Sequence, residues 1–315
     1  MLSIDYDHDY FPPRMLASAD RRLTTSWGDV LWAALTVGRP DLYHVFRFGN
    51  PSLHEAIFRL SMVRMALEQR NWRGRLWRTD AFKHMDPTER GAINYFLGLV
   101  FCKLFASEKL GAPWCLHLDV WRHTLNPTLL AGRSRPDLVA QNAVSGAWYA
   151  FESKGRASVP RNNEKVRAKA QASRLVRVGR RSCRLHVGAI SYYSGDVLRF
   201  YWRDPEADGR NEVKIPEPKN EWRMYYAPFA ALYRANAGNL KSPSPNASVV
   251  VRELDVNLRI HPAIWELIAA ERWVEARAMA SELREQFENA GYHPDGLGVS
   301  AGKSWHVERR TRRKL

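Results

Sequence analysis

Three charged side chains in the middle of the chain are suited to act together, namely Asp137, Glu152 and Lys154. Successive side chains of a β-strand point to opposite faces, so Glu152 and Lys154 share one face and Ser153 points away from it. Carboxylate oxygens are the ligands that Mg²⁺ prefers, and a nearby ammonium group stabilises negative charge. If the three side chains converge, the two acids could bind a divalent cation while the lysine stabilises a neighbouring anion.

The residues between these side chains are typical of a β-hairpin. Residues 135–140 and 148–155 contain two β-like runs, and Ser145-Gly146 between them are turn residues. Asp137 stands at the start of the first run, and the other two charged residues stand at the end of the second. We therefore expect the hairpin to bring all three to one end.

The pattern Pro136-Asp137 followed by Glu152-Ser153-Lys154 resembles that of the PD-(D/E)xK phosphodiesterases, the restriction-endonuclease-like superfamily. The resemblance implies phosphodiester hydrolysis with Mg²⁺, for which Mn²⁺ would substitute. Asp137, Glu152 and the backbone carbonyl of Ser153 would hold the ion. Lys154 would orient the attacking water or stabilise the developing charge. A plain ion pair between Glu152 and Lys154 is the alternative.

The fold class implied by the resemblance is α/β, with a restriction-endonuclease-like αβββαβ core. The order of the elements that the sequence predicts agrees with such a core. These elements are a helix from Asp86, a strand over 113–121, the hairpin, a helix over 162–178, and strands over 185–193 and 197–202. The nuclease core is therefore expected over residues 86–204.

The helix that starts this core offers one further acid. Asp86 is a good N-cap, Pro87 suits the first helical position, and Glu89 stands where a capping-box acid belongs. Glu89 shares a face with Ile93 and Phe96, so it is expected to face inward. In the resembled superfamily such a helix often contributes an acid, which implies Glu89 as a metal ligand and catalytic residue. A capping role alone is the alternative.

Other polar residues are candidates for the surroundings of the site. Gln171 projects from the apolar stripe of the helix expected over 162–178, and a polar residue there needs a partner. The resemblance implies a place beside the site for Gln171, although a strand edge would also satisfy it. In the strand expected over 113–121, Asp119 is a lesser candidate, and His117 is expected to be structural.

The charge of the chain favours a polyanionic partner. The formal net charge is +15 and the pI is about 10.0, which favours nucleic acid first. The basic residues that follow the motif are predicted to bind the phosphate backbone. They are Lys165, Lys169, Arg174 and Arg177. A solvated helix face is the alternative interpretation of this cluster.

The flanks of the core are predicted to be separate regions. Residues 1–20 look irregular, and residues 1–85 as a whole form a mainly helical N-terminal region. Residues 205–247 form a Pro-rich connector. Residues 248–315 form a helical C-terminal region with a basic tail, in which 262–290 would be two helices broken near 270–272.

The cellular compartment is predicted from three features that the sequence does not show: a C-x-x-C pair, a signal peptide and a membrane-spanning stretch. The three cysteines include no C-x-x-C pair, which fits a reducing cytoplasm. No signal peptide is visible, and the most apolar stretch, residues 92–106, is too short to cross a bilayer. We therefore expect a cytoplasmic protein that does not use a membrane.

Together these features predict a divalent-metal-dependent nuclease, in which the flanks choose the substrate. DNA is the favoured substrate and RNA the alternative; a protein partner or a homodimer is left open. Enzymes of the resembled superfamily are often found in defence or mobile-element biology. The alternative function is a non-catalytic nucleic-acid-binding or scaffold protein that retains the fold.

Overall fold

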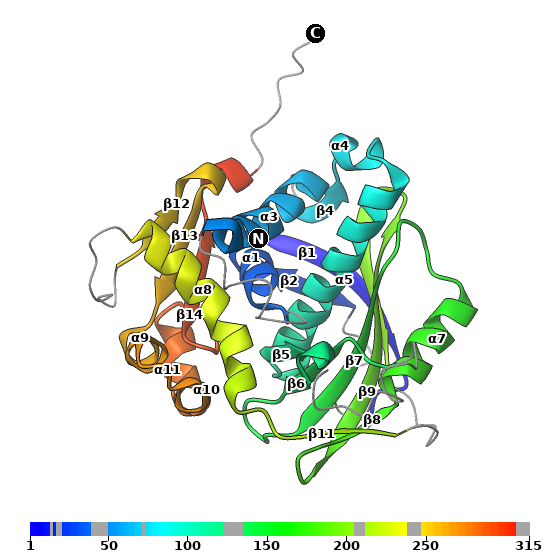
Figure 1. Cartoon of the computed structure of the whole chain (residues 1–315). Helices are drawn as coiled ribbons and strands as arrows, with labels where there is room; N and C mark the ends of the chain where they lie inside the picture. The colour runs from blue at the N-terminus through cyan, green and yellow to red at the C-terminus, as the bar shows by residue number, and fades with distance from the viewer. Residues whose placement is uncertain are drawn as a thin grey trace.

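The protein is a mixed α/β structure in which helices cover a large mixed β-sheet (Figure 1). A computed structural model describes residues 1–12, 15–16, 21–38, 50–70, 73–121, 135–204, 212–237 and 247–306. Within these residues the large sheet has 11 strands, and a separate sheet of three strands lies near the C-terminus.

The expected hairpin lies near one edge of the large sheet. The five strands on this side of the sheet are β5 (Trp114–His117), β6 (Leu138–Gln141), β7 (Trp148–Gly155), β9 (Arg181–Ser194) and β10 (Val197–Arg203), and β6 and β7 form the hairpin. β5, β6 and β7 are antiparallel neighbours, β7 pairs with β9 in parallel, and β9 pairs with β10 antiparallel. A parallel pair requires a crossover, and α7 (Asn162–Ala172) supplies it between β7 and β9.

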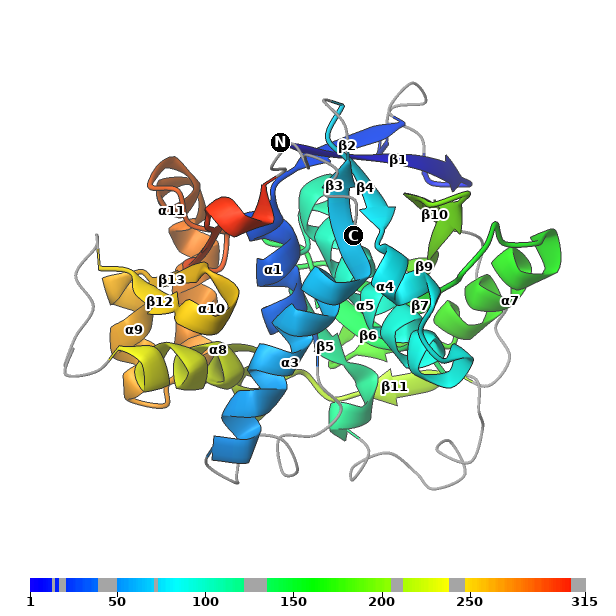
Figure 2. The same cartoon turned by 90° about the horizontal axis from the view of Figure 1, so that it is seen from above.

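Helix α5 (Pro87–Leu110) begins as predicted, because Asp86 Oδ1 accepts from the backbone N–H of Thr88 at 2.8 Å. The helix packs unusually close to β7. A Cβ atom on Gly155 would lie 1.6 Å from the carbonyl oxygen of Asn94, so only glycine fits there. α5 and α7 cover opposite faces of the sheet beside β7 (Figures 1 and 2).

The helix expected over 162–178 is shorter in the structure. α7 ends at Ala172, and β8 (Leu175–Val178) follows, paired with β9 and with β11 (Val213–Ile215). Leu175 and Val178 are buried as expected, but from a strand. The β-branched residues of this segment suit an extended conformation, and neighbouring strands complete it.

The N-terminal region is mixed, so the prediction of a mainly helical region is wrong in part. Residues 1–20 include strand β1 (Leu2–Asp9), which pairs in parallel with β10 and antiparallel with β2 (Arg22–Thr25). Leu2, Ile4 and Tyr6 are buried in alternation. The other elements are α1 (Trp27–Thr36), α3 (Asn50–Ala66), β3 (Leu67–Arg70), β4 (Arg75–Arg78) and α4 (Asp80–Lys83).

The C-terminal region also contains strands that the sequence did not predict. β12 (Val249–Val251), β13 (Val256–Ile260) and β14 (Leu297–Ala301) form the three-stranded antiparallel sheet. Where two helices were expected over 262–290, the structure has three, α9 (Pro262–Ala269), α10 (Trp273–Glu282) and α11 (Arg284–Asn289). The expected break at 270–272 separates α9 from α10, and a second break at Leu283 separates α10 from α11. The basic tail lies outside the described residues.

The interior is continuous across the regions that the sequence predicts. From the expected Pro-rich connector, helix α8 (Arg223–Asn236) buries its aromatic face against α1 and α3 (Figure 2). The main cluster of buried side chains includes residues from all four expected regions. The boundaries between these regions stay predictions. Among the described residues, no helix is both long and apolar enough to cross a bilayer.

Candidate active site

A pocket of about 410 Å³ opens where the hairpin meets α5 and α7. It brings together four of the five predicted catalytic side chains, those of Asp137, Glu152, Lys154 and Gln171. Its other lining residues are Tyr95, His117, Asp119, Arg135 and Pro136. The expected convergence at one end of the hairpin is therefore present.

Strand pairing positions the two predicted metal carboxylates. Leu138 pairs with Phe151, so Asp137 lies just beyond the paired part of β6 and Glu152 next to it on β7. The backbone N–H of Ser153 donates to Asp137 Oδ2 at 2.9 Å, which fixes one oxygen of that carboxylate. The backbone N–H of Leu118 donates to the carbonyl of Asp137 at 2.9 Å. Both bonds hold Asp137 from the backbone.

Glu152 is a buried acid, and only one of its two carboxylate oxygens has a hydrogen-bond partner among the described residues. Its residue is 1% exposed, and Lys154 Nζ donates to its Oε1. Its Oε2 is buried and accepts no hydrogen bond from the described residues. Burial, together with the charge of Asp137, raises the pKa of Glu152 to about 8, although Lys154 opposes both. Such a carboxylate favours a proton or a cation as its partner.

Asp137 shares this environment. Burial raises the pKa of Asp137, although the bond from Ser153 and the charge of Lys154 offset part of the rise. Asp137 is half-buried and Glu152 is buried, and two carboxylates in one such pocket repel each other when both are ionised. A divalent cation between them would relieve both the burial penalty and the repulsion.

The donor set fits Mg²⁺ better than a metal that needs a full protein cage. Among the described residues, no group of three or more His, Cys, Asp or Glu could hold an ion. Mg²⁺ usually takes one or two carboxylates and completes its shell with water and substrate phosphate. Asp137 and Glu152 suit that role, and the carbonyl of Ser153 stays a predicted third ligand.

Glu89 does not join the other predicted residues. It is exposed and does not line the pocket, so the expected inward orientation is wrong. α5 presents Tyr95 to the pocket instead, and Tyr95 directly follows Asn94, which makes the close contact with β7. The pKa of Tyr95 is raised by burial and by the charges of Asp137 and Glu152, so its hydroxyl stays protonated.

One wall of the pocket comes from the segment after β5. The strand expected over 113–121 ends at His117, and residues Leu118–Trp121 form a 3₁₀ turn, η1. Asp119, the lesser candidate, lines the pocket from this turn and accepts a hydrogen bond from Arg135. Burial lowers the pKa of His117 to about 4, with the charge of Arg135 adding to this and Asp119 opposing it. His117 is therefore neutral at pH 7.

Sequence reasoning missed Tyr95 and Arg135. Arg135 directly precedes Pro136-Asp137, so adjacency to the motif was the available signal. Tyr95 had no comparable signal, because its exposure of 45% at the pocket depends on how α5 is held against β7.

The predicted basic residues do not lie on one helix face. Lys165 of α7 extends over Tyr201 of β10, with its Nζ 4.0 Å from the ring centroid. Arg174 is half-buried, and Arg177 is exposed on β8 rather than on a helix. The side chain of Lys169 lies outside the described part of the structure. Phosphate binding by these residues stays a prediction.

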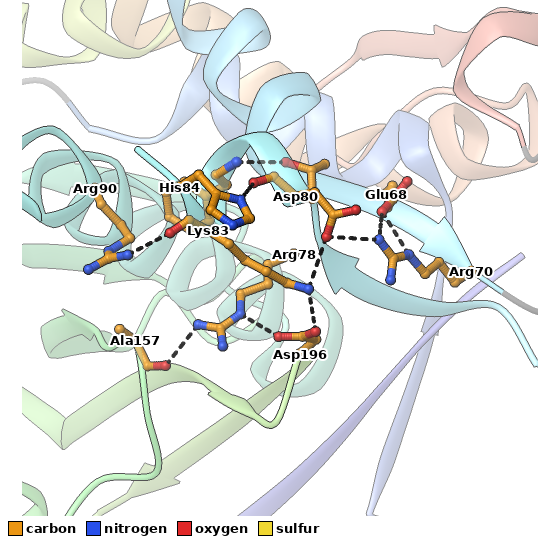
Figure 3. Close-up of polar contacts among 11 residues, drawn as sticks. Glu68, Arg70, Arg78, Asp80, Lys83, His84, Arg90, Ala157 and Asp196 are labelled. Atoms are coloured by element: carbon orange, nitrogen blue, oxygen red, sulfur yellow. Dashed lines mark hydrogen bonds and ion pairs between the residues drawn. The ribbon is translucent and has the colours of Figure 1, made fainter. Parts of the chain in front are cut away.

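A surface network holds the loop that follows Lys154 (Figure 3). Arg78 of β4 donates from Nε to Asp196 at 2.7 Å and from NH1 to the carbonyl of Ala157 at 3.4 Å. Lys83 of α4 pairs with both Asp196 and Asp80. The N-terminal region thus contacts the loop next to the pocket.

Comparisons of the chain with models of protein families, with curated proteins and with solved structures found no match. The function is therefore inferred from the chemistry of the pocket, the order of the elements and the charge of the chain.

Proposed function

We propose that the protein is a divalent-metal-dependent nuclease of PD-(D/E)xK type that hydrolyses phosphodiester bonds, with DNA as the favoured substrate. Glu152 carries this proposal, because its buried Oε2 has no hydrogen-bond partner among the described residues and lies in one pocket with Asp137 and Lys154. The α-helices and strands follow one another as α5, β5, β6, β7, α7, β8 and β9. Apart from the short additional strand β8, this is the order of the core that the resemblance implies, which supports the same function.

Each side chain of the pocket has a role in such a reaction. Asp137 and Glu152 would hold Mg²⁺, which when bound would polarise the phosphate and acidify a water molecule. Lys154 would orient that water or stabilise the charge that develops on the phosphate oxygens. Gln171 would contact the same region from α7. The neutral Tyr95 hydroxyl would donate a hydrogen bond without adding charge.

The substrate class follows from charge. A net charge of +15 attracts a polyanion, and binding through phosphate contacts weakens steeply with salt. A phosphodiester also supplies the oxygens that Mg²⁺ would still need beyond Asp137 and Glu152. RNA has the same backbone chemistry and is the competing substrate.

The decisive experiment compares the wild-type chain with Asp137→Asn and Lys154→Gln. Labelled single- and double-stranded DNA and RNA are incubated with Mg²⁺, Mn²⁺, Ca²⁺ or EDTA. We expect cleavage with Mg²⁺ or Mn²⁺ only, and a loss of about 10³-fold in each variant, since each factor of ten is about 1.4 kcal/mol. Glu275→Gln, which removes an exposed ion pair on α10, is the matched control. Cleavage that persists in both site variants would overturn the assignment.

One observation favours the second candidate, a non-catalytic nucleic-acid-binding or scaffold protein. The pocket lacks the helix acid that the resemblance implies, because Glu89 is exposed outside it. A protein of this kind would bind nucleic acid in a salt-dependent way and cleave none of the four substrates. It would also show no Mg²⁺-dependent increase in melting temperature.

A further inference from the structure

Arg135 and Asp119 form an ion pair on the wall of the candidate active site. Both side chains are 23% exposed, so the pair is largely shielded but reaches the pocket. Asp119 comes from the turn after β5, and Arg135 from the segment before β6. The bond from the N–H of Leu118 to the carbonyl of Asp137 brings these two segments together.

Asp119 is committed to a guanidinium rather than to a cation site. Its Oδ1 accepts from Arg135 NH2, and its own backbone N–H donates to His117 Nδ1 at 3.2 Å. Within the described residues it forms no three-acid group with Asp137 and Glu152 that could hold an ion. The carboxylate therefore serves to orient Arg135.

The guanidinium of Arg135 lines the same pocket as Asp137 and His117, so its charge acts on both side chains. Its charge lowers the pKa of Asp137 and that of His117. A guanidinium carries five N–H donors in a planar fork, so one side chain can bind both a carboxylate such as that of Asp119 and a phosphate oxygen. The fork matches the geometry of phosphate oxygens, which a lysine ammonium does not.

We propose that Arg135 binds a non-bridging oxygen of the scissile phosphodiester, and that Asp119 is the positioning residue that holds its guanidinium. This inference rests on the proposed nuclease function and names a residue that the motif does not contain. Lys154, which pairs with Glu152, and Arg135, which pairs with Asp119, would then hold the substrate phosphate from two walls of the pocket.

The test uses the full chain and a labelled DNA duplex of mixed sequence. Single-turnover cleavage is measured for Arg135→Ala, Arg135→Lys and Asp119→Asn. We expect a loss of about 10²–10³-fold for Arg135→Ala, as for other oriented donors to a transition-state oxyanion. Arg135→Lys should recover part of that loss, and Asp119→Asn should lose about tenfold. Arg284→Ala, which removes an arginine paired with Glu285 on α11, should change nothing.

Two further readouts separate a phosphate contact from a structural role. Guanidinium ions at non-denaturing concentration should rescue Arg135→Ala and none of the other variants. Binding to the same duplex in Ca²⁺ should show a salt slope lower by about 1 for Arg135→Ala. Circular dichroism checks that each variant is folded. If Arg135→Ala is unfolded, Arg135→Lys replaces it in both the cleavage and the binding measurement.

The outcomes distinguish this inference from the proposed function. If the wild type cleaves, Asp137→Asn does not, and folded Arg135 variants cleave like the wild type, the inference is wrong and the function stands. If the wild type cleaves nothing, the proposed function fails, and the inference fails with it as a statement about catalysis. The salt slope then still decides whether Arg135 contacts phosphate.

Discussion

Lys103, Tyr225 and Asp295 form a buried polar cluster where α5 meets α8 and the start of β14, here called the interior cluster. Lys103 Nζ donates to the hydroxyl of Tyr225 at 2.7 Å, and that hydroxyl donates to Asp295 Oδ2 at 2.7 Å. Trp32 Nε1 and the N–H of Leu297 also donate to Asp295, at 2.8 Å and 3.0 Å. The ammonium of Lys103 and the carboxylate of Asp295 therefore both have hydrogen-bond partners inside the protein.

Asp137, Glu152 and Lys154, here called the site cluster, are arranged differently. They also contain buried acids and one lysine, yet Oε2 of Glu152 accepts no hydrogen bond from the described residues. The site cluster also lines a pocket, whereas Lys103 and Asp295 are both 0% exposed. Removal of one partner from a fully paired buried ion leaves the other charge uncompensated and destabilises the fold. A buried polar atom without a partner in the protein is instead a candidate for binding an ion or ligand. The first arrangement is structural, and the second is suited to a ligand.

The largest expected effect is on activity, at the site cluster. Glu152→Gln removes a metal carboxylate and should reduce cleavage by about 10³-fold, because metal assistance contributes several kcal/mol to the barrier. The same change removes a buried anion and should leave the free energy of unfolding in EDTA unchanged or higher. Parallel cleavage and urea-unfolding measurements test this. A clear loss of stability would place Glu152 with the structural acids.

The opposite result is expected at the interior cluster. Asp295→Ala leaves Lys103 buried without its carboxylate and should lower the free energy of unfolding by about 3–5 kcal/mol. Urea unfolding measures the loss, and cleavage by the protein that remains folded at low temperature should be close to wild type. Asp295→Asn, which keeps an acceptor, is the milder control. Full stability of Asp295→Ala would remove the contrast between the two clusters.

The response to pH should sharpen the comparison further. The folded-state pKa of Glu152 is raised from its usual 4.5 to about 8, so the folded state binds more protons than the unfolded chain between these values. Stability in EDTA should therefore fall as pH rises through this window. Melting temperatures measured across it should fall less steeply for Glu152→Gln, and Mg²⁺ should stabilise the wild type most at the alkaline end. Equal slopes for wild type and variant would contradict the buried-acid interpretation.

The smallest expected effect comes from a single hydroxyl. Tyr225→Phe leaves Lys103 and Asp295 without their bridge and should lower the free energy of unfolding by about 1–3 kcal/mol. Tyr233→Phe on the same helix is the matched control, because the Tyr233 hydroxyl is buried without a hydrogen-bond partner among the described residues. That control should lose nothing. Equal losses in the two variants would show that the bridge adds no stability.

The centre of the site was predictable because it depends on local pattern. A hairpin places alternate side chains on one face, and its turn fixes the register, so Asp137, Glu152 and Lys154 had to meet. The cap at Asp86 was equally local. Glu89 was misplaced because helical periodicity gives a face but not the depth at which α5 crosses β7. That depth is set by the contact between Gly155 and Asn94, which no local pattern shows.

The strands at both ends of the chain were missed for a different reason. Leu2, Ile4 and Tyr6 alternate with polar residues, which is a strand signal, but the acids beside them suggested an irregular segment. What stabilises β1 is its pairing with β10, a contact between distant parts of the chain. β13 is likewise a short strand, and it pairs with β12 on one side and with β14 on the other. The pocket wall at Asp119 and Arg135 also required the three-dimensional structure.

Because β1 pairs with β10, this pairing cannot form until the ribosome has made most of the chain between them. Asp9 and Tyr201 are joined by a 2.6 Å hydrogen bond although they are 192 residues apart in the chain. At about 5–20 residues per second, the ribosome needs roughly 10–40 s to make the partner of β1. Throughout that interval β1 has β2 on one side but lacks β10 on the other, and Asp5, Asp7 and Asp9 give it charges that discourage pairing with other chains.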